Sequence, residues 1–200
     1  MASQSWGQLI ATIPVAGTLY NTFTTAQSML TTATATEAAS AFVTLPPGFF
    51  QRGSVLEIEF DAGMSWASGN TMIFTIKIGT VSAIVSSTLK VTTTGGTTEP
   101  LYGLFRLTCR AVGNGTQCLL MPDGFVIGRG ICPAGATAGA NYAAGMGFAM
   151  LREAAPGVGA GFDSTIANTL DFLVTMGTSS ASNGFQLQQY TVKSWGNSAV

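Results

Sequence analysis

Apolar side chains occupy every second position along several stretches of the chain. In "SVLEIEF", Leu56, Ile58 and Phe60 alternate with Glu57 and Glu59. Successive side chains of a β-strand point to opposite faces, so this period buries one face and leaves the other exposed. The same period recurs in Met72, Phe74, Ile76 and Ile78, in Phe105, Leu107, Cys109 and Ala111, and in Leu170, Phe172, Val174 and Met176. Glycine and proline separate these rows, and the pattern predicts an all-β chain.

Further strands are expected in "WGQLIATIP", "TLYNTFTT", "SAIVSSTLKVTTT", "TQCLLMPDGFVIG" and "NGFQLQQYTVKSW". In the last stretch the apolar phase changes between Leu187 and Tyr190, which predicts a β-bulge near Gln188 and Gln189. About eight to ten antiparallel strands, joined by Gly and Pro turns, favour a jelly-roll-like β-sandwich. The strand count alone does not separate a jelly roll from an immunoglobulin-like sandwich.

Residues 1–200 are expected to form a single β-sandwich domain, because no stretch has the composition of an interdomain linker. Residues 1–45 should supply N-terminal strands and an arm for docking. Within residues 1–45, the stretch "AQSMLTTATATEAASAF" is expected to be irregular with at most one helical turn. Its threonines oppose the helix that its alanines favour. Residues 131–162 are rich in Gly and Ala and should form a long loop, either mobile or ordered against a neighbour.

Charged residues are scarce, at 8% of the chain, where an average domain has about 25%. A folded monomer of this mass has roughly 9,000 Å² of surface, so either hydroxyl and amide groups keep it soluble or subunits hide much of it. The net charge of −1, and the absence of Lys and Arg from the first thirty residues, disfavour nucleic acid as a partner. No signal peptide and no apolar run of membrane-spanning length are visible, so we expect a cytosolic product without membrane contact.

Three cysteines, Cys109, Cys118 and Cys132, have no metal-binding spacing. Cys109 and Cys118 flank "RAVGNGTQ", which is expected to be a hairpin turn. If Gly113 and Asn114 form the two-residue loop the cysteines lie opposite each other, and if Asn114 and Gly115 do so they lie diagonally. We expect small buried thiols; the alternative is a bridge between Cys109 and Cys118.

Histidine is absent, which removes the common catalytic triads and imidazole metal sites. Glu57 and Glu59 lie on one strand face about 6.5–7 Å apart, near the spacing of an inverting glycosidase pair. A glycosidase normally takes its acids from different elements, so a solvated face or interface rim is the preferred interpretation. Asp61, Asp123, Asp163 and Asp171 could supply calcium ligands, but they lack the spacing of a calcium loop. We therefore expect no catalytic, cofactor-binding or metal-binding residues.

The glycine-rich stretches 128–130 ("GRG") and 157–161 ("GVGAG") lack the lysine and the flanking strand and helix of a phosphate loop, and we expect turns. Asn114-Gly115-Thr116 is formally a glycosylation acceptor but is better explained as the hairpin turn. Trp6, Trp66 and Trp195 could stack on sugar rings, although core or interface anchoring is the more usual role.

Four stretches together resemble a family of small jelly-roll virion proteins encoded by tailed bacteriophages. They are "SMLTTATATEAASAFVTLPPGFFQRGSVLEIEFDAGMSW", "MIFTIKIGT", "YGLFRLTCRAVGNGTQCLLMPDGFVIG" and "NTLDFLVTMGTSSASNGFQLQQYTVKSW". The likeness spans most of residues 28–195 and lies in the order and spacing of the blocks; the long Gly/Ala segment departs from the family pattern. The resemblance implies a structural role on the particle, as a head decoration or minor capsid protein or as a fibre or spike component, commonly as a trimer.

The sequence thus leads to three functional hypotheses. The first is a non-enzymatic virion protein, made in the host bacterial cytoplasm, that forms a homotrimer and docks on the major capsid protein or other virion proteins. The second is a fibre or spike receptor-binding module, in which exposed tryptophans or the Ile131–Phe162 loop recognise a host-surface glycan. The third and weakest is a glycan hydrolase that uses Glu57 and Glu59.

Overall fold

The protein is an all-β sandwich, described here from a computed structural model. The structure describes residues 7–13, 16–17, 19–30, 43–66, 69–91, 99–133, 146–150 and 157–196. Within these ranges the chain forms fourteen strands and no helix, and all strand pairs are antiparallel. The sandwich predicted from the alternating rows is therefore confirmed.

Nine of the strands have five or more residues: β1 (Gly7–Ile13), β5 (Val55–Ser65), β6 (Thr71–Ile78), β7 (Val81–Val85), β9 (Glu99–Ala111), β10 (Leu119–Arg129), β12 (Met146–Met150), β13 (Asn168–Met176) and β14 (Gly184–Trp195). The other five are short: β2 (Tyr20–Asn21), β3 (Gln27–Ser28), β4 (Val43–Leu45), β8 (Leu89–Val91) and β11 (Ile131–Pro133). The expected eight to ten strands fit the long set. The short strands exceed that count because two or three residues show no periodicity.

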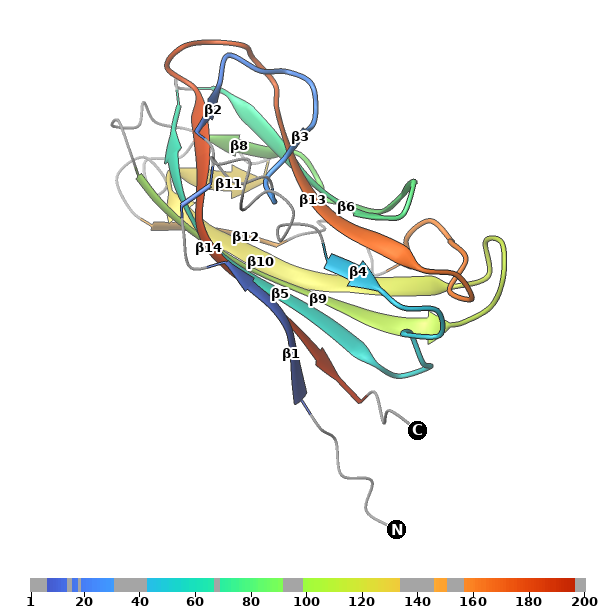
Figure 1. Cartoon of the computed structure of the whole chain (residues 1–200). Coiled ribbons are helices and arrows are strands. Elements are labelled where there is room, and N and C mark those ends of the chain that lie inside the picture. The colour runs from blue at the N-terminus through green and yellow to red at the C-terminus, as the bar shows by residue number, and fades with distance from the viewer. Residues whose placement is uncertain are drawn as a thin grey trace.

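The strands divide into two seven-stranded sheets that face each other (Figure 1). The first has the order β1-β14-β5-β9-β10-β12 with β2 beside β14, and the second has the order β11-β8-β6-β13-β3 with β4 beside β13 and β7 beside β6. The pairs nest along the chain: β1 with β14, β4 with β13, β5 with β9, and β6 with β7 and β8. Nested pairs that alternate between two sheets follow the order of a jelly roll, to which β10, β11 and β12 are added.

The core between the sheets is built around phenylalanines from both layers. Phe60 on β5 and Phe105 on β9 meet Phe74 on β6 and Phe172 on β13. The Phe74 and Phe172 rings stack with centroids 5.6 Å apart, and the Phe60 and Phe172 rings lie 4.9 Å apart. All four side chains are at most 1% exposed. Aromatic burial of this kind supplies hydrophobic area together with favourable ring geometry, and it joins the two sheets.

Gly103 makes room for this core. A β-carbon on Gly103 would lie 2.1 Å from an atom of the Phe60 ring, so only glycine lets the ring approach β9 this closely. Glycine in a strand interior often marks such a close approach. The smallest residue on β9 is therefore part of the aromatic packing.

The β-bulge expected near Gln188 and Gln189 is confirmed. The register of β14 against β5 shifts between Leu187 and Gln189, and Gln189 then pairs with Asp61. A bulge moves the following residues to the other phase, which places Tyr190 in the core.

The segment 131–162, expected to be one long loop, contains two strands. β11 pairs with β8, β12 pairs with β10, and Phe162 forms a bridge with Cys118. The sequence pattern misses β12 because small Gly and Ala side chains hide the period of a strand, and it misses β11 because three residues are too few to show one. Any ordering of this segment against a neighbour concerns residues 134–145 and 151–156, which lie outside the described residues, as do residues 1–6 and 31–42 of the expected N-terminal arm.

We predict that Phe172→Ala lowers the free energy of unfolding by about 3–5 kcal/mol, because it removes a ring that contacts both sheets. Phe125→Ala is the matched control, since Phe125 is half-buried on the outer face of β10. Urea denaturation measures both. Equal losses would contradict a core that depends on the four-ring cluster.

Candidate functional site

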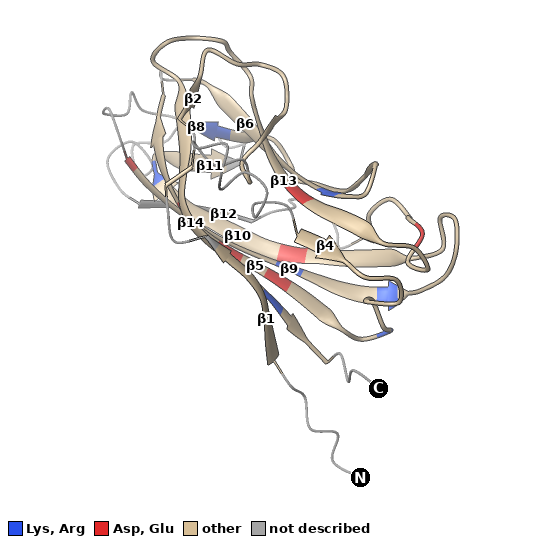
Figure 2. Cartoon of the chain, viewed as in Figure 1, with Lys and Arg blue, Asp and Glu red and all other residues tan. Residues whose placement is uncertain are grey.

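The outer face of the first sheet carries the acidic side chains singled out in the sequence. Leu56, Ile58 and Phe60 of β5 are buried in the core, so Glu57 and Glu59 project to the opposite face. Figure 2 shows how few charged residues the sandwich has, with acidic positions on β5 close to basic positions on neighbouring strands. This face is where the candidate acid pair of Glu57 and Glu59 would have to act.

The glutamates on this face are paired with cations of the flanking strands. Arg106 lies directly across from Glu57 on β9, and its Nε is 2.9 Å from Glu57 Oε2. Lys193 on β14 places its Nζ 3.1 Å from Glu59 Oε2. Opposite charges across neighbouring strands stabilise a sheet modestly. The alternation that turns the acids to the outer face therefore also brings their counter-ions beside them, and Glu57 is only 9% exposed.

Neutral donors complete the network. The Tyr102 hydroxyl donates to Glu59 Oε1 at 3.0 Å, and the Gln189 amide donates to Asp61 Oδ2 at 2.6 Å. Hydrogen bonds from Lys193 and then Tyr102 lower the pKa of Glu59 below its ordinary value of 4.5. Burial, followed by the hydrogen bond to Glu59, raises the pKa of Tyr102 to about 12. At neutral pH Glu59 is thus an anion and Tyr102 a neutral donor.

This arrangement differs from that of a glycosidase acid pair. A general acid at neutral pH needs a raised carboxyl pKa, whereas the partners of Glu59 lower its pKa. Glu57 is held by Arg106 on the same open sheet face. The geometry therefore supports an interpretation of Glu57 and Glu59 as cross-strand ion-pair partners.

The four aspartates considered for calcium binding lie on separate elements. Asp61 accepts from Gln189, and Asp171 accepts from Ser28 at 2.5 Å. Asp123 accepts from the backbone of Gly124, and Asp163 accepts from Thr165. Within the described ranges, no three His, Cys, Asp or Glu side chains gather in a metal-binding group.

The glycine-rich stretches have packing and turn roles. Gly130 has a φ of 69° in the turn between β10 and β11, as expected for a turn glycine. In the second stretch, residues 157–161, glycine is required by close packing. A β-carbon on Gly159 would lie 1.7 Å from the carbonyl oxygen of Ala83, and one on Gly161 would lie 1.9 Å from the carbonyl oxygen of Thr116. This stretch passes close to other backbone, and Gly159 donates its N–H to the Leu120 carbonyl at 2.9 Å.

Two of the three tryptophans can be placed, and they differ. Trp66 is 1% exposed and belongs to the core, whereas Trp195 at the end of β14 is 41% exposed. Trp6 lies outside the described residues. Trp195 is thus the candidate aromatic platform of the described chain.

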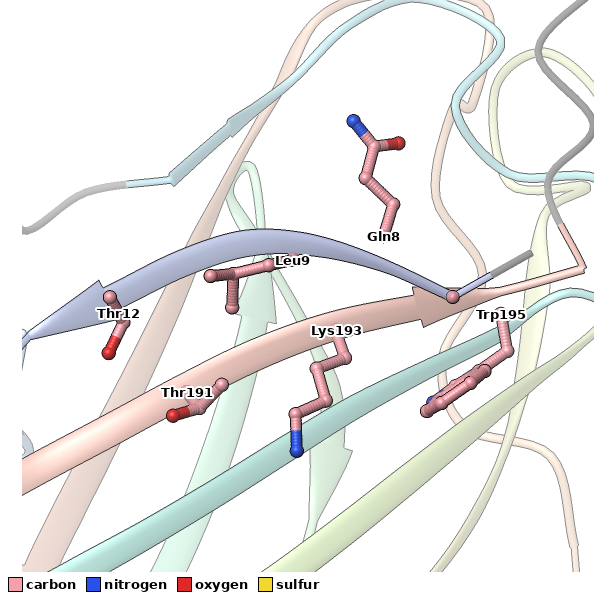
Figure 3. A pocket seen from close by; sticks show the side chains of 7 residues that line it. Gln8, Leu9, Thr12, Thr191, Lys193 and Trp195 are labelled. Atoms are coloured by element: carbon pink, nitrogen blue, oxygen red, sulfur yellow. The ribbon is translucent and has the colours of Figure 1, made fainter.

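Trp195 borders a groove of about 450 Å³ on the outer face at the β1 edge of the sheet. We call it the β1/β14 groove; its lining residues are Gly7, Gln8, Leu9, Thr12, Thr191, Lys193 and Trp195. Figure 3 shows Thr191, Lys193 and Trp195 projecting from one side of β14, while Gln8 points to the other side of β1. The sequence singles out Trp195 as a candidate but does not predict the groove, because the residues that line the groove come from opposite ends of the chain.

The cysteine loop is longer than a two-residue turn. Ala111 of β9 pairs with Leu119 of β10, and the Gln117 N–H donates to the Asn114 carbonyl at 3.2 Å. The glycosylation-like triplet thus lies in the turn. Cys109 and Cys118 are fully buried free thiols that hydrogen-bond to each other; this contact lowers the pKa of Cys109 and raises that of Cys118.

Within the described parts of the chain there is no helix long and apolar enough to cross a membrane.

We predict that none of the three cysteines reacts with a thiol reagent in the folded protein, because each is 0% exposed. After denaturation without reductant, three thiols should react per chain, since all three cysteines are free. A colorimetric thiol assay gives both counts. A count of one after denaturation would establish a bridge instead.

A second prediction concerns acid stability. Because the folded-state pKa of Glu59 is lowered, ionised Glu59 stabilises the fold above pH 4.5, and this contribution is lost as the pH falls through the lowered pKa. The free energy of unfolding should therefore fall less with acidification in Glu59→Gln than in the unaltered protein. Asp123→Asn, at an exposed position of β10, is the control, and an equal effect there would contradict a special role for Glu59.

Comparison with known proteins identifies no family for this chain. No family model matches the chain, and no curated protein matches it.

Proposed function

We propose that the protein is a non-enzymatic structural component of a tailed-bacteriophage virion, a capsid decoration or minor capsid protein that assembles as a homotrimer. The observation that carries the proposal is the outer face of the first sheet, where Glu57 and Glu59 are already paired with Arg106 and Lys193. These four charges neutralise one another in pairs. The face can be covered by another subunit with a smaller desolvation cost than a face of free charges.

Exposed apolar side chains give a second line of support. Leu19, Val85 and Ile166 are 57%, 48% and 55% exposed, although they belong to residue types that are usually buried. They belong to three separate segments of the chain, between β1 and β2, on β7 and before β13. Exposed apolar side chains in separate segments suit a subunit that meets both its own copies and a shell.

The acidic residues provide the argument against hydrolysis. Glu59 is ionised at neutral pH, and both glutamates sit in ion pairs on the sheet face. These ion pairs favour a structural protein over a hydrolase. The resemblance of the strand and turn blocks to phage jelly-roll virion proteins supports the site of action, the phage particle, with the major capsid protein or other virion proteins as partners.

A receptor-binding role on a fibre or spike is the alternative. One observation favours it, the exposed Trp195 beside the β1/β14 groove. A host-surface glycan would be its ligand. This role is compatible with the same fold and trimer.

Native mass spectrometry of the purified full chain tests the assembly. We expect a species of three times the 20.5 kDa chain mass at micromolar concentration. Lysine substitutions at Leu19, Val85 and Ile166, made one at a time, should weaken the trimer where that residue is covered, whereas Ser179→Lys at an exposed polar position should not. A monomer throughout would refute the trimer, and absence of the chain from a cryo-electron map of the intact particle would refute the virion role.

A further inference from the structure

The β1/β14 groove has the size and setting of a small-ligand site. Its volume of about 450 Å³ falls within the roughly 300–1,000 Å³ of typical ligand sites. Three cross-strand pairs form its floor: Gly7 with Trp195, Leu9 with Lys193, and Thr12 with Thr191. Because paired strands hold these side chains, the groove is preformed and does not depend on a loop.

Trp195 supplies a flat apolar wall. A β-carbon on Gly7 would lie 2.4 Å from the Trp195 ring, so the indole rests directly on the backbone of β1. Glycine at position 7 thereby fixes the ring in place while 41% of the Trp195 residue remains exposed. The negative face of an aromatic ring attracts weakly positive C–H groups, such as those on one face of a pyranose.

Polar groups lie beside this wall. Lys193 has three donor hydrogens, and its contact with Glu59 at 3.1 Å leaves others free for a ligand. The hydroxyls of Thr12 and Thr191 can each donate and accept. The groove therefore combines one apolar surface with a row of groups that match alcohol hydroxyls.

Charge narrows the ligand class. Lys193 is compensated by Glu59, so the described residues that line the groove present no uncompensated cation to attract a phosphate or an anionic sugar. The chain has a net charge of −1, which disfavours nucleic acid. An uncharged ring with one C–H face and several hydroxyls fits both the indole and the polar row.

We propose that the β1/β14 groove binds a neutral pyranose, with the ring stacked on Trp195 and its hydroxyls bonded to Lys193, Thr191 and Thr12. Leu9, 58% exposed, borders the same groove and extends its apolar side. The inference goes beyond the assembly role and does not depend on it, because it concerns one edge of a single subunit.

The test is an NMR titration of the ¹⁵N-labelled full chain. The probes are methyl glycosides of glucose, galactose, mannose and N-acetylglucosamine, with a dephosphorylated bacterial surface polysaccharide as a second arm. We expect the indole resonance of Trp195, assigned with Trp195→Phe, to shift while that of buried Trp66 does not. No Trp195 shift with any glycoside or with the polysaccharide would overturn the proposal.

Variants then identify the groove. Trp195→Ala should weaken binding at least about tenfold, equivalent to about 1.4 kcal/mol. Gly7→Ala should also weaken it, because the added methyl displaces the ring without touching the ligand. Lys193→Met should weaken binding, whereas Lys77→Met on β6 of the other sheet is the matched control. Undiminished binding in both Trp195→Ala and Gly7→Ala, with thermal melting showing folded protein, would place the sugar elsewhere and refute the site.

The two arms separate the sources of the sugar. A response to free glycosides indicates recognition of a single ring, and a response only to the polysaccharide that Trp195→Ala abolishes indicates a cell-surface chain. Both support the proposal. Neither depends on the oligomeric state, so a failed trimer test and a failed sugar test remain distinguishable.

Discussion

The contact of Phe60 and Phe105 with Phe74 and Phe172 is the interaction on which the rest of the structure depends. These rings come from β5, β9, β6 and β13, the central strands of the two sheets, and join them across the core. Because successive side chains alternate, placing Phe60 inward commits its neighbours on β5 to the outer face. Burial of four aromatic residues thus decides where the acidic groups lie.

The same alternation explains how much of the fold could be read from the sequence. Long strands such as β6 and β13 display four apolar residues at every second position, and their limits follow closely. The bulge in β14 was visible as a change of phase at Gln188. β12 was not visible, because Gly and Ala dominate the segment that contains it, and pairing with β10 rather than local pattern makes it a strand.

The candidate site was predictable only in part, because it depends on which strands pair and not only on the alternation within each strand. Glu57 and Glu59 are recognisable in the sequence as an outward-facing row, but their partners Arg106 and Lys193 come from strands whose register the sequence does not state. The groove is harder to predict from the sequence, because Gly7 and Trp195 lie near opposite ends of the chain. They are paired in the register of β1 against β14, which shifts between Leu9 and Ala11 and which the sequence pattern does not predict.

A sheet edge with one tryptophan is a weak site by itself, because a single stacked ring leaves most of a sugar in water. Several copies of the site bind more strongly than one. In the proposed trimer, three linked grooves would make the second and third binding events intramolecular, and linked sites can gain about 10²–10⁴ in avidity without new contacts. Many copies on a particle extend the same gain. The proposed trimer and groove are therefore physically compatible, because the rigid sheet that suits assembly also holds Trp195 and Lys193 in fixed positions for a repeated weak contact.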